Sequence, residues 1–517
     1  MQLFASIGLV AIAGLLQAAS IVTPWDGEPA GWLQLLAMGA LAWQLTMVTR
    51  PARAGLLGWA FATAWLAGTF WWLFVAMHTY AGLAAWLSAL AVLSLSAVLA
   101  AYYAVACIAF VAWTPRNRIG AAALFAAVWT LAELARGVWF TGFGWGAIGY
   151  AHVDGLARAA KFIGVYGVAA LVAWIAFLAT AGLRDFGRPG GLFAWTLAAV
   201  SAVLMAWSPG TFTVSSGSLS VALLQGNIAQ DEKFQAGSGV ADALRWYGDE
   251  LARVRAPLVV APETAIPLLP QQLPDGYWAG LQRQFSSGSQ AAMIGVPLGS
   301  LSSGYTNSVV AFHGAFNGGP DGTSYRYDKH HLVPFGEFIP PFFRWFTDLM
   351  SIPLGDFNRG AVGQSSFRWR GQRLAPNICY EDLFGEELGA RFLDPDNMPT
   401  IFVNVSNIGW FGNTTAIDQH RNISRMRALE FDRPFVRATN TGDTVIIDHT
   451  GRVTHSIPRH TRGVLLGEVE GRMGTTPFAW WVSRWGLLPY WLAAASVTML
   501  CFLVRRRWRQ LPGAGEI

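Results

Sequence analysis

The chain has 517 residues, of which 53% are hydrophobic and 13% charged, with 25 tryptophans and a formal net charge of +5. This composition is too apolar for an ordinary soluble enzyme and indicates a protein of the lipid bilayer. The positive charge comes largely from arginines in short loops, so it gives no reason to expect nucleic acid as a partner.

Eight apolar segments are long enough to cross a bilayer, which takes about 20 helical residues. They cover residues 3–23, 31–49, 55–77, 81–113, 119–137, 162–183, 190–208 and 485–504. The fourth is long enough to be divided, but arginines in short loops mark the cytoplasmic side and favour one helix there. With that count, arginines follow every second segment: Arg50 and Arg53, Arg116 and Arg118, Arg184 and Arg188, and Arg505, Arg506, Arg507 and Arg509.

This charge pattern predicts three regions. Residues 1–209 form a membrane bundle of seven helices, residues 210–480 form a catalytic domain, and residues 481–517 form the eighth helix with a basic cytoplasmic tail. Both termini are then cytoplasmic, and the catalytic domain lies on the outer face, which in a bacterium is the periplasmic face of the inner membrane. Glu133 and Arg136, one turn apart in the fifth segment, either pair with each other or line a path for a lipid headgroup.

Within residues 210–480, short β-branched runs alternate with helical stretches, which predicts layered α/β packing. Strands are expected at 220–224, 258–261, 293–296, 307–312, 374–379, 401–405 and 444–448, and helices at 240–254, 277–285 and 417–431. Glu263 follows the second of these strands and Cys379 ends the fifth. Functional groups converge at strand ends in such folds.

Cys379 is the only cysteine outside the apolar segments, since Cys107 and Cys501 lie within them. In an oxidising compartment an unpaired thiol is a liability, so its presence favours a chemical role over that of an inert buried thiol. A thiol with a pKa of about 8.5 is only about 3% thiolate at neutral pH. It therefore needs a base and a cation, and Glu263 and Lys329 are the candidates.

Three ordered motifs carry a resemblance. Residues 262–267 (PETAIP), 327–337 (YDKHHLVPFGE) and 377–381 (NICYE) resemble the Glu, Lys and Cys motifs of the nitrilase, or carbon-nitrogen hydrolase, superfamily. With the predicted spans, the chain resembles the apolipoprotein N-acyltransferase family. Segments that also match are 224–228 (LQGNI), 404–407 (NVSN), 410–412 (WFG), 427–430 (RALE) and 437–442 (RATNTG). Ile408 departs from the pattern, because an acidic residue is expected after Asn407.

The resemblance implies an eight-helix membrane bundle carrying an α/β nitrilase-like αββα sandwich. It implies that Glu263 takes the proton of Cys379, whose sulfur accepts an acyl chain from a phospholipid, typically phosphatidylethanolamine. The thioester then passes its acyl chain to the α-amine of a diacylglyceryl-cysteine at the N-terminus of a lipoprotein. Lys329 and the backbone N–H of Tyr380 would hold the oxyanion, and no cofactor is required.

The same motifs contain three further candidates. Glu337 and Glu381 either orient Lys329 or Cys379 or serve as ion-pair partners, and Trp410 is a candidate for positioning the substrate. The aromatic segment 340–354 either forms a lid at the membrane interface or packs on the domain.

Other readings remain open at this stage. Asp328, His330, His331 and His420 are ligand types, but adjacent histidines point to opposite faces of an extended segment and the spacing does not suit zinc, so no metal is expected. The same triad also supports a membrane-tethered amidase that transfers to water. A domain that only binds lipoproteins would need no triad.

Overall fold

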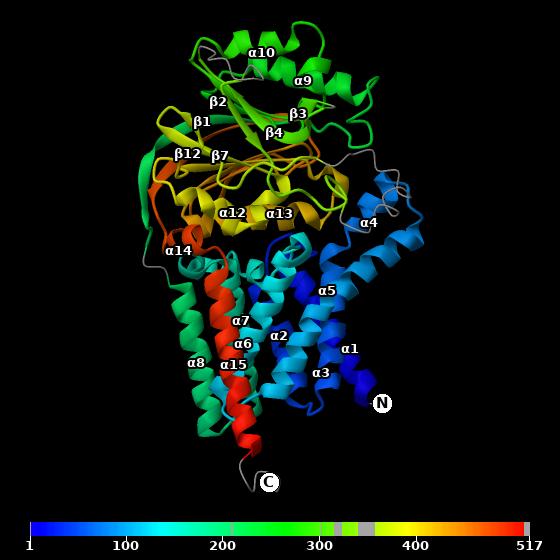
Figure 1. Cartoon of the computed structure of the whole chain (residues 1–517), viewed down its shortest axis with the longest axis vertical. Coiled ribbons are helices and arrows are strands. Elements are labelled where there is room, and N and C mark those ends of the chain that lie inside the picture. Colours follow the sequence, from blue (N-terminus) through cyan, green and yellow to red (C-terminus); the bar gives the residue numbers. More distant parts are fainter. Residues whose placement is uncertain (1, 208–209, 301, 315–322, 340–356, 511–517) are drawn as a thin grey trace. The chain divides into compact units, whose positions relative to one another are not determined.

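A computed structural model describes residues 2–207, 210–300, 302–314, 323–339 and 357–510 (Figure 1). The chain divides into two compact units. The helical unit comprises Met1–Phe74, Ala85–Gly210 and Trp485–Ile517, and the sandwich unit comprises Val75–Ala84 and Thr211–Arg484. The short segment Val75–Ala84 thus belongs with the sandwich although it is flanked by membrane-type helices.

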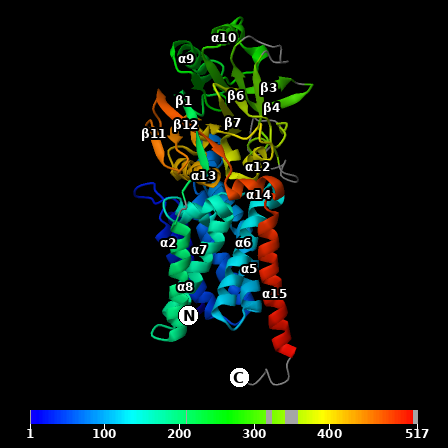
Figure 2. The same ribbon diagram turned by 90° about the vertical axis from the view of Figure 1, so that its left-hand side faces the viewer.

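The helical unit consists of long helices (Figure 2), and their sequences are almost entirely apolar. Their bounds are α1 (Gln2–Ile21), α2 (Gly31–Thr46), α3 (Pro51–Phe70), α5 (Ala85–Trp113), α6 (Arg118–Val138), α7 (Ala160–Arg184), α8 (Pro189–Ala206) and α15 (Leu488–Gln510). Short helices connect some of them: α4 (Leu73–Val75) and η1 (Ala76–Tyr80) follow α3, while η2 (Trp139–Thr141), η3 (Ile148–His152) and η4 (Leu156–Ala159) follow α6.

Among the described residues, six helical stretches are long and apolar enough to cross a membrane. A seventh is added if the bent pair Pro51–Phe70 and Leu73–Tyr80 counts as one span. Helix α2 has 16 residues, fewer than the roughly 20 that a bilayer requires. The chain therefore has several membrane-length apolar helices, and the count of eight stays a prediction.

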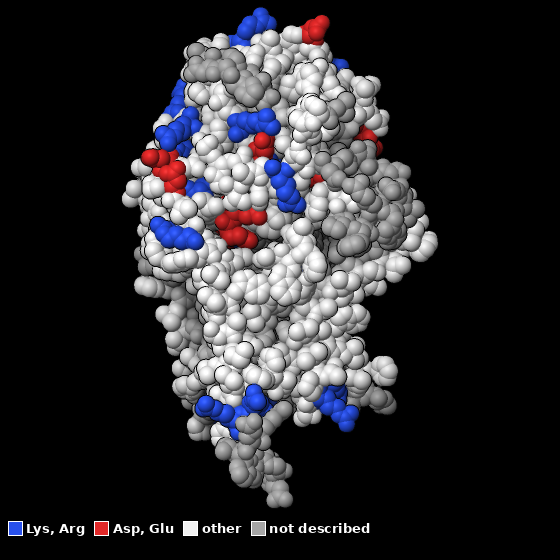
Figure 3. Space-filling view, viewed as in Figure 1, with Lys and Arg blue, Asp and Glu red and all other residues white. Residues whose placement is uncertain are grey.

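Charged side chains on the helical unit gather at the ends of its helices. Figure 3 shows an uncharged face over most of the unit's length, with Lys and Arg at one end. The exposed arginines of its connections and tail are Arg50, Arg116, Arg118, Arg158, Arg184, Arg188, Arg506 and Arg507. This distribution suits a bilayer, because a charge at its centre is costly.

Glu133 and Arg136 of α6 form hydrogen bonds with the following loop. The Glu133 carboxylate accepts from the backbone N–H of Ile148 at 3.0 Å, and the Arg136 guanidinium donates to the carbonyls of Phe143 and Trp145 at 2.6 and 2.7 Å. Arg136 also donates to the Tyr103 hydroxyl at 2.8 Å. These bonds tie residues 143–148 to α6, a role that neither sequence interpretation included.

The sandwich unit contains two six-stranded mixed sheets. The first has the order β12-β1-β2-β3-β4-β5, with bounds β1 (Thr213–Gln225), β2 (Leu258–Val260), β3 (Ala291–Ser300), β4 (Gly304–Phe312), β5 (Tyr325–Asp328) and β12 (Gly463–Gly474). The second has the order β11-β10-β9-β8-β7-β6, with bounds β6 (Phe367–Trp369), β7 (Gln372–Ile378), β8 (Ile401–Ser406), β9 (Phe435–Thr439), β10 (Val445–Ile447) and β11 (Val453–Ser456). The three central strands of each sheet, β1-β2-β3 and β7-β8-β9, pair in parallel.

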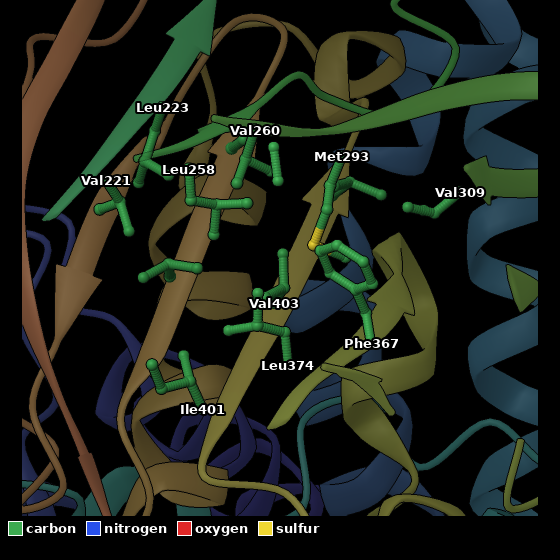
Figure 4. Packing of buried hydrophobic residues seen from close by; sticks show 14 of the residues in the cluster. Val221, Leu223, Leu258, Val260, Met293, Val309, Phe367, Leu374, Ile401 and Val403 are labelled. Carbon is green, nitrogen blue, oxygen red and sulfur yellow. The ribbon is translucent and has the colours of Figure 1, made fainter. Parts of the chain in front are cut away.

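Side chains alternate between the two faces of each sheet, and this alternation creates one apolar layer between the sheets and another under the helices. On β1, Leu219, Val221 and Leu223 face the second sheet, while Ala222 and Leu224 face the opposite way, toward the helices. Figure 4 shows the core between the sheets, where Val221, Leu258 and Met293 of the first sheet meet Leu374, Ile401 and Val403 of the second.

Helices cover both outer faces of the sandwich (Figure 1). Helices α9 (Gly239–Arg253) and α10 (Tyr277–Phe285) pack on the first sheet, and α12 (Gly385–Gly389), α13 (Thr415–Phe431) and α14 (Pro477–Trp485) on the second. The remaining short helices are η5 (Pro270–Gln272), η6 (Cys379–Leu383), η7 (Ala390–Phe392) and η8 (Ile408–Phe411). The predicted αββα layering is confirmed.

Candidate active site

Glu263 lies in a tight turn directly after β2. Thr264, the next residue, has φ 49° in the left-handed region, and the turn packs on Gly295 of β3. A Cβ at position 295 would lie 2.3 Å from the Pro262 carbonyl oxygen and 2.7 Å from the Glu263 Cα. A glycine is therefore required on β3 for the turn to approach this closely.

A buried cluster of two carboxylates, one ammonium and one amide surrounds Lys329. The Lys329 Nζ lies 3.3 Å from the Glu263 Oε1 and 2.9 Å from the Glu337 carboxylate. The Asn307 side chain donates to both carboxylates at 2.7 Å, and each of the four residues is less than 10% exposed. Asn307 was not singled out from the sequence, because it carries no charge and lies within β4.

The charged groups in this cluster shift one another's pKa values. Burial disfavours the charged form of Lys329, but the Glu337 and Glu263 carboxylates outweigh it and raise its pKa. Burial also opposes ionisation of Glu263, yet Lys329, Asn307, Lys233 and the Asn407 backbone N–H together lower its pKa below the ordinary 4.5. At neutral pH the cluster thus holds an ionised carboxylate next to a permanent cation.

Cys379 was predicted as the last residue of a strand, but it lies one residue beyond the strand that the structure shows. Strand β7 ends at Ile378, and Cys379 begins the 3₁₀ turn η6 with φ 52°. Its carbonyl oxygen accepts from the Asn404 side chain at 3.2 Å and from His420 Nε2 at 3.1 Å. The left-handed backbone turns the chain sharply at the end of a buried strand, and Cys379 as a residue is half-buried there.

The thiol of Cys379 responds to the neighbouring charges. Burial and the Glu263 carboxylate raise its pKa to about 12, against the opposing effects of Lys329 and the Ser406 hydroxyl. The resting site therefore contains a protonated thiol, an ionised carboxylate and a fixed ammonium. This arrangement can add sulfur to a carbonyl group while the thiol proton moves to the carboxylate.

Glu381 connects the turn at Cys379 to the segment that carries Lys329. Its Oε2 accepts from the Ile378 backbone N–H at 2.7 Å and the Tyr327 hydroxyl at 2.8 Å. Its Oε1 accepts from the backbone N–H groups of His330 and His331 at 2.7 and 3.2 Å. Of the two roles expected for Glu381, its contacts favour orientation of the site.

A second buried network supports η6 from α13 and β9. Asp382 Oδ1 accepts from His420 Nε2 at 2.9 Å, and Oδ2 accepts from Arg437 Nη1 at 2.9 Å and from the Ser424 hydroxyl. Because Arg437 donates to His420 Nδ1, the ring proton of a neutral His420 belongs on Nε2. Burial opposes the charge of Asp382, but His420 and Arg437 lower its pKa.

Asn407 connects the Glu263 turn to the loop after β1. Its backbone N–H donates to Glu263 Oε2 at 2.8 Å, and its side chain donates to Gln230 Oε1 at 2.9 Å. Ile408, the departure noted in the sequence, is buried at the start of η8. The hydrogen bond to Glu263 comes from the backbone, so it does not depend on the residue at 408.

Tyr380 and Trp410 occupy different surroundings. The Tyr380 ring is buried 5.6 Å from the His331 ring and 5.2 Å from that of Phe384. Trp410 is half-buried on η8, where its ring meets Tyr80 edge-on at 6.0 Å. No described contact joins Trp410 to the Glu263 cluster, so its role in positioning substrate stays a prediction.

The other residues considered from the sequence have protein partners. Asp328 accepts from Ser308, His330 bonds to the Gly360 carbonyl, and His331 bonds to Glu387. Among the described ranges, no group of three or more His, Cys, Asp or Glu residues is arranged to hold a metal ion. The aromatic segment 340–354 lies outside the described residues.

Comparisons with known proteins cover both units. The family model for the apolipoprotein N-acyltransferase N-terminal domain matches residues 13–178, and the carbon-nitrogen hydrolase model matches residues 220–478. An apolipoprotein N-acyltransferase of Verminephrobacter eiseniae is 59% identical over 498 residues, covering 92% of both chains. Those of Ralstonia nicotianae and Bordetella bronchiseptica are 41% and 40% identical, covering 92% and 97% of this chain and 90% and 97% of the relatives.

Proposed function

This chain belongs to the apolipoprotein N-acyltransferase family, and we propose that it performs acyl transfer with Cys379 as nucleophile, Glu263 as general base and Lys329 as oxyanion donor. The chain is a membrane enzyme that acylates lipoproteins through a covalent thioester. The observation that best supports the residue roles is the buried contact of Lys329 with Glu263 at 3.3 Å, together with the effect of both charges on the thiol of Cys379.

In the first step Glu263 takes the Cys379 proton while the sulfur attacks an ester carbonyl of a phospholipid, for which phosphatidylethanolamine is the proposed donor. Lys329, with the backbone N–H of Tyr380 as a second donor, stabilises the oxyanion, and one such donor is worth about 3 kcal/mol. The lysophospholipid oxygen leaves with the proton held by Glu263. A thioester on Cys379 remains.

In the second step the α-amine of a diacylglyceryl-cysteine attacks the thioester carbonyl. Glu263 removes a proton from the amine, Lys329 again holds the oxyanion, and the sulfur leaves with that proton. The product is an amide, and the thiol is restored. We place this chemistry on the periplasmic face of the bacterial inner membrane, because the arginine-rich loops favour the cytoplasm.

Intact mass spectrometry of the full-length protein in phospholipid micelles tests this proposal. A diacyl phospholipid should add one acyl group to Cys379, and a diacylated lipopeptide added later should remove it and gain the same mass at its amine. Cys379→Ala should prevent the adduct, and Glu263→Gln should leave no adduct on the time scale of the wild-type reaction.

Two results would contradict the proposal. An adduct lost to water at an equal rate with and without lipopeptide indicates a hydrolase. A protein that binds the lipopeptide but never forms an adduct only binds lipoproteins.

A further inference from the structure

A second buried lysine borders the active site. Lys233, in the loop between β1 and α9, is 1% exposed, and its Nζ donates to the backbone carbonyl of Glu263 at 3.1 Å. Among the described residues this is the single hydrogen bond of an ammonium that carries three N–H groups. The mechanism above does not use it.

The loop that carries Lys233 is fixed to the catalytic turn. Asn440 exchanges two hydrogen bonds with the backbone of Ile228, at 2.9 and 3.0 Å. Asn407 bonds to Gln230 in the same loop and, through its backbone N–H, to the Glu263 carboxylate. Lys233 is therefore held at a set position relative to the catalytic base.

The charge of Lys233 acts on both partners in the proton transfer. Burial lowers the pKa of Lys233 to about 7, against the opposing pull of the Glu263 carboxylate and the Cys379 sulfur. Lys329 differs, because Glu337 and Glu263 raise its pKa. The site thus combines a permanent cation with a second cation that titrates near neutral pH. Asp231 and Glu232 are the other charged groups on the Lys233 loop.

The composition of the chain makes this lysine unusual. Of 36 Lys and Arg residues, three are lysines, at positions 161, 233 and 329. Arginine cannot lose its charge in a protein, whereas lysine can be neutral when buried. Two of the three lysines, Lys233 and Lys329, lie at the candidate active site, where the gain or loss of a charge would change the proposed proton transfer.

We propose that Lys233 is a positioning residue that holds the Glu263 turn and, when charged, stabilises the negative charge passing from Glu263 to the Cys379 sulfur and on to the substrate oxygen. This inference rests on the proposed function of Glu263 and Cys379. Lys233 keeps its proton throughout the transfer, and the thiol proton still goes to Glu263.

The proposal predicts a pH dependence with a defined sign. Below a pH of about 7 Lys233 is charged and Glu263, with its lowered pKa, stays ionised, so thioester formation is fast. As the pH rises through 7, Lys233 loses its charge, and the rate of thioester formation should fall about tenfold. A tenfold change corresponds to about one unit in the pKa difference that drives transfer of the thiol proton to Glu263.

The test measures thioester formation on the full-length protein in phospholipid micelles, by intact mass, from about pH 5.5 to about pH 9. Lys233→Met should be about tenfold slow at the acid end and should converge with the wild type at the alkaline end. Lys233→Arg keeps its charge and should remove the fall near pH 7. The matched control is Lys161→Met, since Lys161 is also buried and donates to a backbone carbonyl, that of Gly210, at 3.1 Å.

The outcomes separate this inference from the proposed function. If Lys233→Met slows the reaction by the same factor at every pH, Lys233 is only structural and the inference is overturned. A fall near pH 7 that persists in Lys233→Arg also overturns it, and this variant decides the question alone if Lys233→Met does not fold. Failure of the wild type to form any adduct instead overturns the proposed function.

Discussion

At the scale of single residues, the proposed nucleophile is protonated at rest. With a pKa of about 12, roughly one Cys379 in 10⁵ is a thiolate at neutral pH. Free thiolate is then too scarce to carry the proposed reaction, so we expect sulfur attack and proton transfer to Glu263 to be coupled. Ionisation of Glu263 should therefore control the rate at low pH.

The Glu263→Gln variant should lower the rate of thioester formation by about 10²- to 10⁴-fold, because the amide cannot accept the proton. In the wild type the rate should persist below pH 4.5 and disappear as the pH falls through the lowered pKa of Glu263. Stopped-flow acylation by a soluble aryl ester measures both. A rate already lost above pH 4.5 would show that another group limits the reaction.

Lys329 compensates two carboxylates, so its removal should cost stability as well as activity. The Lys329→Met variant should lose about 3–5 kcal/mol of unfolding free energy, since it leaves Glu263 and Glu337 buried side by side. Adding Glu337→Gln should recover part of this stability without recovering acylation. Chemical denaturation measures the first effect and mass spectrometry the second. If the double variant is no more stable than Lys329→Met alone, repulsion between the two buried carboxylates is not what destabilises Lys329→Met.

At the scale of elements, the proposed catalytic geometry depends on turns at strand ends that accept unusual backbone angles. Thr264 and Cys379 both have positive φ, at 49° and 52°. The sequence predicted these strand ends to within a residue, because β-branched runs are periodic. It did not predict the angles, which depend on tertiary contacts such as that between Gly295 and the Glu263 turn.

Gly295→Ala should displace the Glu263 turn. The added Cβ meets backbone atoms closer than 3 Å, so we expect a loss of about 1–3 kcal/mol and at least a tenfold slower acylation. Gly280→Ala on α10 is the matched control, since a Cβ there meets nothing within 4 Å and should stabilise the helix by about 0.5–1 kcal/mol. Equal effects of the two variants would mean that the turn tolerates displacement.

Glu381→Gln should loosen the connection between the Cys379 turn and the Lys329 segment. Four groups now donate to the two carboxylate oxygens, whereas an amide has a single acceptor oxygen. Some of these donors would therefore lose their partner, and each buried donor left without one costs about 1–3 kcal/mol. Acylation should slow while binding of lipopeptide stays unchanged. Glu250→Gln, which removes a surface pair with Arg253, should change stability by less than about 1 kcal/mol. A Glu381→Gln variant with the wild-type acylation rate would exclude this role.

At the scale of the whole molecule, sequence patterns predicted the architecture more completely than they predicted the residues of the candidate site. Apolar length gave the membrane helices, and alternation gave seven strands of the sandwich. It missed β5, β6, β9, β11 and β12, because they are short, contain glycine, or carry buried charges such as Arg437 on β9. Glu263, Lys329 and Cys379 followed from motifs, whereas Lys233 and Asn307 became apparent only from contacts. The rarity of lysine was the one available signal for Lys233.

The proposed topology can be tested with an impermeant maleimide on intact cells, in a Cys379→Ala background. Asp249→Cys, exposed on α9, should react from outside, because residues 210–480 are expected in the periplasm. Arg188→Cys, exposed before α8, should react only after the membrane is opened. The reverse pattern would invert the proposed orientation.

The pairing of β1 with β12 bears on how such a chain arose. Thr213 stands opposite Gly474, so the first and last strands in chain order are neighbours, and the chain enters and leaves the sheets at points about 5 Å apart. A module with adjacent ends can enter a loop of a host gene without disturbing the host's own path. The two sheets have the geometry of such an insertion, to which the separate segment Val75–Ala84 adds one further piece of chain.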